Sequence, residues 1–383
     1  MDIKNRKLFR LTRFLLLKVP AVFRFLAMFR KPAKRLLLIK TDAIGDYIIF
    51  RNFIEVLKKS EKYRDYQIDL LGNKLWRDLN ETYDKQYLNE TYFINNPNSY
   101  YEAPLETLKL SWRLFKNKYE IVLQPTYTRI FLTDGLAALT AAKQIIGYES
   151  DNEGIFPRYK NKTDKFYTQL LPLSKENYFE FNRNVFFFET VTGEKISLKA
   201  PWIGVNSDHK KGIAILPGAG AFKRGWEGEK FLDLIKRLLQ ETNEPIYLIG
   251  GPGEVKAGEF LMQNLPEGSI ENRINKTTLP QLIDTIGGSS LLIANETSAI
   301  HMAVAAQTPS VCILGGGHFE RFAPYPAGTP NAPVCVYEKL PCYYCNWLCI
   351  YKTEANEPFP CISAVTLENM WQAILPLIAK QLN

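Results

Sequence analysis

Two parts of the chain alternate short apolar runs with amphipathic segments, and this alternation constrains the fold more than any other feature. It occurs in residues 35–148 and again in residues 212–317. Short apolar runs bounded by turn residues predict buried strands, and apolar residues at every third or fourth position predict helices. A repeated strand–helix–strand order is typical of a mostly parallel sheet with helices on both faces. The sequence therefore predicts an α/β protein with two Rossmann-like, doubly wound domains.

The chain of 383 residues is longer than one hydrophobic core usually supports, so two domains are expected. A polar connection separates the two alternating parts, whereas residues 149–174 lose the periodicity and are predicted to form a surface loop. The predicted divisions are a basic segment, an N-terminal domain, a C-terminal domain and a final helix, at residues 1–34, 35–195, 196–365 and 366–383. Because doubly wound sheets bind ligands beyond the carboxyl ends of their strands, a central cleft between the domains is expected to hold the ligands.

The positive charge of the chain is concentrated near its N-terminus. Residues 1–35 hold eleven Lys and Arg against the single acid Asp2, whereas the whole chain has a net charge of +8. The remaining residues are therefore close to neutral, which argues against nucleic-acid binding by the globular part. Basic residues interrupt every apolar run of this segment, so neither a membrane-spanning helix nor a cleaved signal peptide is expected.

The same segment has the pattern of a basic amphipathic helix. On a helical wheel, one half holds the basic residues Arg6, Lys7, Arg10, Arg13, Lys18 and Arg24. The other half holds the apolar residues Leu8, Phe9, Leu15, Leu16, Val19, Phe23, Leu26 and Phe29. A kink is expected at Pro20. The pattern fits a helix that lies on an anionic membrane surface, and an ordinary helix packed on the protein is the alternative.

Six cysteines occur late in the chain, and four of them are closely spaced: Cys342, Cys345, Cys349 and Cys361. Late, clustered cysteines are not the framework of a disulfide-rich fold, so a reducing cytosol is expected. The spacing C-x2-C-x3-C-x11-C is compatible with a structural zinc or iron–sulfur site. Packed free thiols or a redox-labile pair are the alternatives.

Two carboxylates lie where the first predicted strand gives way to a helix, in LLLIKTDAIGDYIIF. Thr41 and Asp42 follow the strand, and Asp46 opens the helix. Asp46 could act as a general base. Thr41 and Asp42 could contact an acceptor substrate, although Asp42 could also only cap the loop. One glycine cannot form the G-x-G-x-x-G turn of a dinucleotide fold, so an oxidoreductase is not expected.

Two glycine-rich stretches of the second half could bind a phosphate-containing ligand. In AILPGAGAFKRGWEGEKF, Gly218 lies in the turn and is followed by Lys223 and Arg224 before a helix; in PIYLIGGPGE, Gly250 and Gly251 occupy the turn. Backbone N–H groups at such turns, a helix N-terminus and basic side chains together hold phosphate. An ordinary turn is the alternative for each.

Polar residues also occur at two other strand-to-helix junctions. Glu296, Thr297 and Ser298 follow the apolar run LLIAN, where they could reach a ligand or cap the following helix. His301 lies one turn further and could contact the ligand or be a structural histidine. Arg129 precedes the predicted helix and could meet an acceptor phosphate, or it could be a solvated surface residue.

Three blocks in this order resemble the family 9 glycosyltransferases, the bacterial ADP-heptose:lipopolysaccharide heptosyltransferase group. They are the strand–loop–Gly-Asp–helix of residues 36–60, the PGA…KRGW…F block of residues 214–254, and NETSAIHMAVA…TPSVCILGG with ERFAPY in residues 291–325. The resemblance runs from about residue 35 to the end of the chain.

The resemblance implies a two-domain glycosyltransferase-B fold and inverting, metal-independent sugar transfer. The nucleotide sugar would lie mainly on the C-terminal half and the acceptor on the N-terminal half. The family's proposed base falls on Asp46, and its diphosphate contact falls on Arg224, with Lys223 beside it. The family's Asp-Thr-Gly-x-x-His pattern becomes Glu-Thr-Ser-x-x-His at Glu296–His301, which leaves the identity of the sugar open.

Residue chemistry agrees with this expectation. An inverting transfer needs one base and a positive charge on the leaving diphosphate. The chain has no Asp-x-Asp triplet to hold a metal ion, so basic residues and helix N-termini would supply that charge.

We therefore expect a glycosyltransferase that moves a heptose or related sugar from an ADP-heptose-like nucleotide-diphosphate donor to a lipid-linked saccharide such as lipopolysaccharide core. No cofactor is expected for transfer. The enzyme would be cytoplasmic and peripheral on the inner face of the plasma membrane. A nucleotide-sugar epimerase of the same fold and a non-catalytic nucleotide- or glycan-binding homologue are the alternatives.

Overall fold

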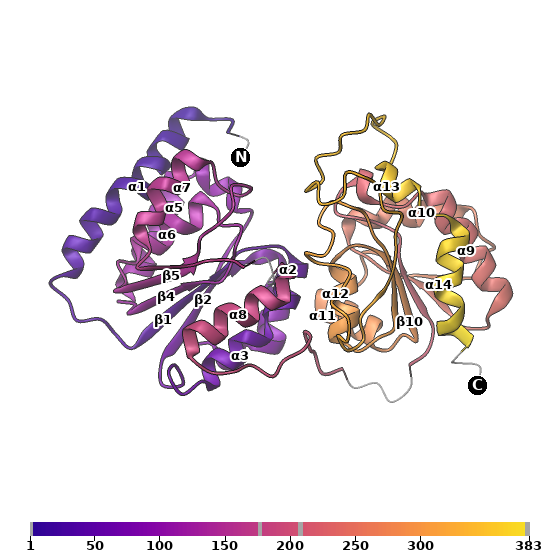
Figure 1. Ribbon diagram of the computed structural model, residues 1–383, viewed down its shortest axis with the longest axis horizontal. Coiled ribbons are helices and arrows are strands. Elements are labelled where there is room, and N and C mark those ends of the chain that lie inside the picture. The colour runs from indigo at the N-terminus through magenta and orange to yellow at the C-terminus, as the bar shows by residue number, and fades with distance from the viewer. Residues whose placement is uncertain (1–2, 175–177, 206–209, 380–383) are drawn as a thin grey trace. The chain divides into compact units, whose positions relative to one another are not determined.

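The computed structural model describes residues 3–174, 178–205 and 210–379, and the chain forms two compact units (Figure 1). Unit 1 comprises Met1–Tyr178 and Asn182–Ser197, and unit 2 comprises Phe179–Phe181 and Leu198–Asn383. The main division therefore lies two residues beyond the predicted boundary. The basic N-terminal segment belongs to unit 1, and the final helix belongs to unit 2.

Unit 1 contains a parallel sheet of six strands in the order β3-β2-β1-β4-β5-β6. The strands are β1 (Arg35–Lys40), β2 (Gln67–Asn73), β3 (Thr91–Ile94), β4 (Ile121–Gln124), β5 (Gln144–Tyr148) and β6 (Gln169–Leu171). The four apolar residues Leu36–Ile39 of β1 are all buried, as expected for a strand with both faces covered. The strand order reverses between β1 and β4, and loops at such a switch point commonly form a ligand site.

Helices cover both faces of this sheet (Figure 1). One group consists of α1 (Arg6–Ala27), α5 (Pro104–Lys116), α6 (Phe131–Leu139) and α7 (Pro157–Thr163). The other consists of α2 (Ile44–Phe50), α3 (Asn52–Lys59) and α8 (Glu180–Thr192), and a short α4 (Arg77–Leu79) follows β2. Two predictions need correction here. The helix expected over residues 45–60 is divided at Arg51, and residues 149–174 contain α7 and β6 instead of forming only a loop.

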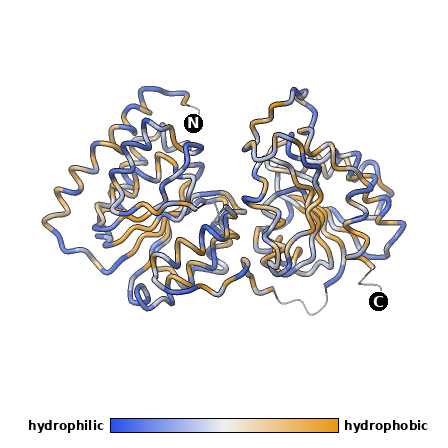
Figure 2. The backbone as a smooth tube through the Cα atoms, in the orientation of Figure 1, coloured by the Kyte–Doolittle hydropathy of each residue, from blue (hydrophilic) through white to orange (hydrophobic). Residues whose placement is uncertain are grey.

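Helix α1 packs against the body of unit 1 and continues through Pro20. Leu16 and Phe23, from the half predicted to face lipid, are buried instead. The ring of Phe23 lies 4.6 Å from that of Phe115 on α5, and a Cβ atom at Gly135 of α6 would lie only 2.6 Å from Leu16. The alternative of a packed helix is therefore right for these residues. Figure 2 shows apolar and polar residues interspersed along α1, and no helix of the described residues is long and apolar enough to cross a membrane.

Unit 2 repeats the same topology, with a six-stranded parallel sheet in the order β12-β11-β10-β7-β8-β9. The strands are β7 (Ile213–Leu216), β8 (Ile246–Leu248), β9 (Glu271–Asn272), β10 (Leu291–Asn295), β11 (Ser310–Ile313) and β12 (Val334–Val336). The helices are α9 (Gly228–Glu241), α10 (Val255–Gln263), α11 (Leu279–Gly287), α12 (Ser298–Ala305), α13 (Pro360–Ser363) and α14 (Leu367–Ala379). The switch point here lies between β7 and β10. Two doubly wound α/β units confirm the predicted fold class.

Candidate active site

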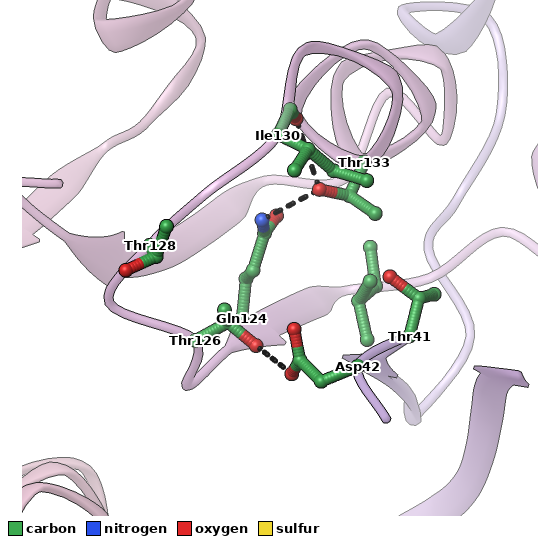
Figure 3. A pocket seen from close by; sticks show the side chains of 8 residues that line it. Thr41, Asp42, Gln124, Thr126, Thr128, Ile130 and Thr133 are labelled. Carbon is green, nitrogen blue, oxygen red and sulfur yellow. Dashed lines mark hydrogen bonds between the residues drawn. The ribbon is translucent and has the colours of Figure 1, made fainter. Parts of the chain in front are cut away.

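A small polar pocket lies at the switch point of unit 1, beyond the carboxyl ends of β1 and β4 (Figure 3). Its lining residues are Ile39, Thr41, Asp42, Gln124, Thr126, Thr128, Ile130 and Thr133. Four threonine hydroxyls, one amide and one carboxylate offer donors and acceptors of the kind that bind sugar hydroxyls. This pocket is the candidate acceptor site, and it includes the predicted residues Thr41 and Asp42.

Asp42 is held by several contacts. Its carboxylate accepts a 2.7 Å hydrogen bond from the hydroxyl of Thr126 and lies 2.8 Å from the ammonium of buried Lys40. The carbonyl of Asp42 accepts a hydrogen bond from the indole of Trp76, and that of Thr41 accepts one from Asn73. These contacts hold the loop after β1 in place. Because its carboxylate and its carbonyl are both engaged within unit 1, the structure favours the loop-capping interpretation of Asp42.

Asp46 lies in the first turn of α2 and is half-buried. The next four residues, Tyr47–Phe50, are fully buried and anchor the helix. The Tyr47 hydroxyl donates to Asp84 at 2.6 Å, and Asp84 also forms a buried ion pair with Arg51 at 2.7 Å. This network fixes the position of α2. The Asp46 carboxylate is thereby held on a rigid element just after the loop that lines the pocket.

Arg129 does not present its charge to an acceptor in this structure. Its side chain is fully buried, its Nη2 donates to Asp164, and its Nη1 lies 3.4 Å from Asp134. Its guanidinium carbon also lies 4.4 Å from the centre of the Tyr167 ring. Burial raises the pKa of Asp134, and Arg129 opposes that effect. The prediction of an acceptor contact is therefore corrected to a structural ion-pair network, because two carboxylates of the same unit enclose the guanidinium.

In unit 2, Asn295 joins the two sides of the switch point. Its Nδ2 donates to the carbonyls of Pro217 and Gly218, at 3.1 and 2.9 Å, and its Oδ1 accepts from the backbone N–H of Trp226 at 3.0 Å. The residue at the end of β10 thus holds the glycine-rich turn after β7. As a result, Arg224 in that turn and Glu296 after β10 are brought into electrostatic contact.

Three buried polar atoms at this switch point have no hydrogen-bond partner among the described residues: Arg224 Nε, Glu296 Oε2 and Thr297 Oγ1. Thr297 is the N-cap residue of α12, yet its hydroxyl makes no capping hydrogen bond. Burial raises the pKa of Glu296 to about 7, and Arg224 opposes that shift. Unpaired buried polar atoms are costly, so their concentration beside a helix N-terminus indicates a binding site for a polar, phosphate-containing ligand.

Lys223 and the predicted glycines are engaged within the protein. The ammonium of Lys223 donates to Thr353, at 2.7 Å to its hydroxyl and 3.2 Å to its carbonyl. The N–H of Gly251 donates to the Glu254 carboxylate at 2.7 Å, and a Cβ atom at Gly218 would lie 2.3 Å from the Glu254 side chain. Gly218 therefore leaves room for the Glu254 side chain, and Gly251 binds its carboxylate. The Gly251 N–H and the Lys223 ammonium are thus engaged in hydrogen bonds within unit 2.

Three predicted donor-site residues of unit 2 remain: Ser298 and Gly250 lie at the strand-to-helix turns, and His301 lies in the core. Ser298 begins α12 and is half-exposed beside the unpaired group at Thr297. Gly250 has φ = +149°, a conformation that glycine adopts without strain. His301 points away into the protein, where its Nδ1 lies 2.8 Å from the Tyr325 hydroxyl. Burial lowers the pKa of His301 to about 4, so this histidine is neutral at pH 7 and structural.

Sequence reasoning missed Trp347, which covers Arg224. The guanidinium carbon of Arg224 lies 4.2 Å from the centre of the Trp347 ring. The indole N–H donates to His318 at 3.3 Å, and the ring lies so close to Gly315 and Gly317 that a Cβ atom at either would clash. The glycine triplet after β11 was the available signal, because three successive glycines allow a bulky ring to lie on the backbone.

The four closely spaced cysteines lie near one another in unit 2 but are free thiols. Burial raises the pKa of Cys342, and the neighbouring Cys345 and Cys349 raise it further. Burial also raises the pKa of Cys361, and Cys342, Cys345 and Cys349 add to that increase. Among the residues that the structure describes, no three His, Cys, Asp or Glu side chains are grouped so that they could hold a metal ion. The zinc or iron–sulfur site that the spacing allows therefore stays a prediction.

Several solved structures have a similar fold. The ADP-heptose lps heptosyltransferase II of E. coli has a TM-score of 0.66 at 15% identity, over 91% of this chain and 100% of that one. A family 9 glycosyl transferase from Veillonella parvula has a TM-score of 0.67 at 17% identity, over 91% and 98%. The iron-containing dodecameric glycosyltransferase TibC from enterotoxigenic E. coli has a TM-score of 0.54 at 13% identity, over 92% and 77%. At these identities the likeness establishes the fold, and the iron is a property of TibC.

Sequence comparison identifies the family more directly. Comparison with curated proteins gives no match. However, the model of glycosyltransferase family 9 (heptosyltransferase) matches residues 108–346, which span parts of both units. This range covers more than half of the chain and includes both sides of the unit 2 switch point. The chain therefore belongs to glycosyltransferase family 9, and it is a glycosyltransferase.

Proposed function

We propose that the protein transfers a heptose or a related sugar from an ADP-heptose-like donor to a lipid-linked saccharide such as lipopolysaccharide core. The main support is the group of unpaired buried polar atoms on Arg224, Glu296 and Thr297 at the switch point of unit 2. Structures with the same fold include an E. coli heptosyltransferase with bound ADP, named WaaC. Family membership supplies the reaction class, and these residues supply a place for the donor.

In the proposed reaction, the Asp46 carboxylate takes the proton from an acceptor hydroxyl. The hydroxyl oxygen attacks the anomeric carbon from the face opposite the diphosphate, so the configuration inverts. The bond between the anomeric carbon and the diphosphate oxygen breaks, and its electron pair leaves with the nucleoside diphosphate. A positioned base of this kind commonly contributes about 10²–10⁴-fold to the rate.

Negative charge develops on the diphosphate as it leaves. The guanidinium of Arg224 and the uncapped N–H groups of α12 are the donors that would stabilise it. We propose that the Thr297 hydroxyl donates a hydrogen bond to the same diphosphate oxygens. The Glu296 carboxyl group would form a hydrogen bond with a hydroxyl of the donor sugar. Because these groups provide the positive charge, the proposed step requires no metal ion.

The lining of the unit 1 pocket supports an acceptor rich in hydroxyl groups. A lipid-linked acceptor resides in a membrane. The strongly basic helix α1 supports a location of the enzyme at an anionic membrane surface. We propose that the enzyme is cytoplasmic and peripheral on the inner face of the plasma membrane.

The test measures sugar transfer and ADP release by the full chain, with ADP-heptose and a panel of UDP-sugars and with heptose-deficient lipopolysaccharide as acceptor. Wild type is expected to transfer the heptose. Asp46→Asn and Asp46→Ala are expected to lose about 10²–10⁴-fold in kcat, with little change in the KM for the donor.

The matched control is Asp65→Asn, which removes an exposed carboxylate of the same unit. It is expected to retain wild-type kcat. Near-wild-type kcat in both Asp46 variants would refute the base assignment. Absence of turnover by wild type across the donor panel would refute the proposed reaction itself.

A further inference from the structure

The outward face of α1 carries an apolar stripe that the fold leaves uncovered. It lies opposite the buried residues Leu16 and Phe23. Four of its residues belong to the helix and two follow it directly, and all are between 54 and 77% exposed: Leu11, Phe14, Val22, Phe25, Met28 and Phe29. We call these six residues the outer apolar stripe. Soluble proteins rarely expose so many large apolar side chains side by side unless the surface binds something.

Positive charge surrounds the outer apolar stripe. Helix α1 contains six basic residues and no acidic one; the basic residues are Arg6, Lys7, Arg10, Arg13, Lys18 and Arg24. Lys7 and Lys18 fall on the stripe itself at helical spacing, and both are exposed. Lysine stems can cover apolar surface while their ammonium groups reach a charged layer above it. The combination matches an interfacial helix that binds anionic lipid.

The helix is held firmly in this orientation. At its start, the N–H of Asn5 donates to the Glu102 carboxylate at 2.8 Å. Beyond its end, the guanidinium of Arg30 donates to the carbonyl of Thr140 at 3.0 Å and also to that of Phe115. Because both ends are attached to unit 1, the outer apolar stripe faces away from that unit as a rigid surface. It does not need to unfold or rotate to become available.

The apolar surface extends to the neighbouring helix α5. Leu105, Leu108 and Trp112 recur there at helical spacing and are 71, 39 and 46% exposed. The Trp112 ring lies 6.0 Å from that of Phe23 on α1. Tryptophan is enriched where proteins meet the boundary between lipid and water. A second helix therefore adds apolar area of the kind that a membrane interface accepts.

We infer that the outer apolar stripe inserts into one leaflet of an anionic bilayer, with α1 lying parallel to the membrane surface. This inference deepens the proposed peripheral location and identifies the residues that contact lipid. Apart from Phe29, they differ from the apolar half predicted on the helical wheel. A second copy of the chain would also cover the apolar residues. However, it would bring together two acid-free basic helices, whose charges repel, whereas anionic lipid neutralises them.

The experiment measures binding of the full chain to vesicles by sedimentation, without donor or acceptor, so that it is independent of the proposed reaction. Vesicles of phosphatidylcholine and phosphatidylglycerol are compared with phosphatidylcholine alone. Wild type is expected to bind the anionic vesicles more tightly and to lose part of this binding at high salt. The double variant Phe14→Asp/Phe25→Asp is expected to bind about a hundredfold more weakly, because each lost Phe accounts for about a factor of ten.

The matched control is Leu348→Asp/Ile350→Asp, which places the same charges on exposed apolar residues of unit 2. It is expected to retain wild-type binding. Thermal unfolding of each variant checks that the fold is intact. Equal binding by the α1 variant and the control would overturn the inference. So would a wild-type dimer that the α1 substitutions dissociate, with no binding to anionic vesicles.

Discussion

Replacing Glu296 with Gln tests the electrostatics of the candidate donor site. The carboxyl group is buried, and one of its oxygens has no hydrogen-bond partner among the described residues. Burial raises its pKa from an ordinary 4.5 to about 7. A shift of that size corresponds to a stability difference of about 3 kcal/mol between the two protonation states. Gln has the same shape but does not titrate, so the variant lacks this dependence on pH.

The sign follows from proton binding. Between pH 4.5 and about 7 the folded protein keeps a proton on Glu296 that the unfolded chain has released. The contribution of this group to stability is therefore fully present below this window, falls as the pH rises through it and is constant above it. Relative to Glu296→Gln, wild type should lose about 3 kcal/mol between pH 4 and pH 8. For a unit of this size that corresponds to a Tm difference of about 6 to 12 °C.

The assay is thermal unfolding of both proteins by tryptophan fluorescence at several pH values. Trp226 and Trp371 are buried in unit 2 and report on its transition. The difference in Tm between Glu296→Gln and wild type should be larger at pH 8 than at pH 4. Glu267→Gln, at an exposed carboxylate of the same unit, should show no such change. A difference in Tm that is equal at pH 4 and pH 8 would refute the argument from burial.

Three further predictions concern named contacts. Arg129→Ala should lower the free energy of unfolding by about 3–5 kcal/mol, measured by urea denaturation, because the buried Asp134 loses its ion-pair partner. An unchanged stability with a raised acceptor KM would restore the acceptor role. Trp347→Leu should raise the donor KM in wild type but not in an Arg224→Ala background, because the ring acts by positioning that guanidinium; additive effects in the double variant would contradict this. Thr297→Val should weaken ADP binding in calorimetry with little change in Tm, since its hydroxyl makes no capping bond, and a large loss of Tm would assign it a structural role instead.

A site residue could be predicted from the sequence when its role depends only on residues near it in the chain. Asp46 was predicted at the start of a helix after a strand, and α2 begins at Ile44; its catalytic role stays a prediction. Arg224 and Glu296 were singled out from separate motifs, and their electrostatic contact follows from the strand order, which makes β7 and β10 neighbours. Lys223, next to Arg224 in sequence, is directed to Thr353, which lies 130 residues away. No local pattern contains that partner.

The sequence by itself determined the two α/β units, because apolar periodicity is a property of neighbouring residues and each buried strand shows it directly. It also located the basic helix and the glycine-rich turns. Only the tertiary structure decided which face of α1 is covered, since Leu16 packs against a glycine of α6 that is 119 positions further along the chain. In the same way, it decided that Arg129 is enclosed by carboxylates and that Trp347 lies on Arg224. Burial and charge pairing depend on contacts between distant segments, and these exist only once the sheets have assembled.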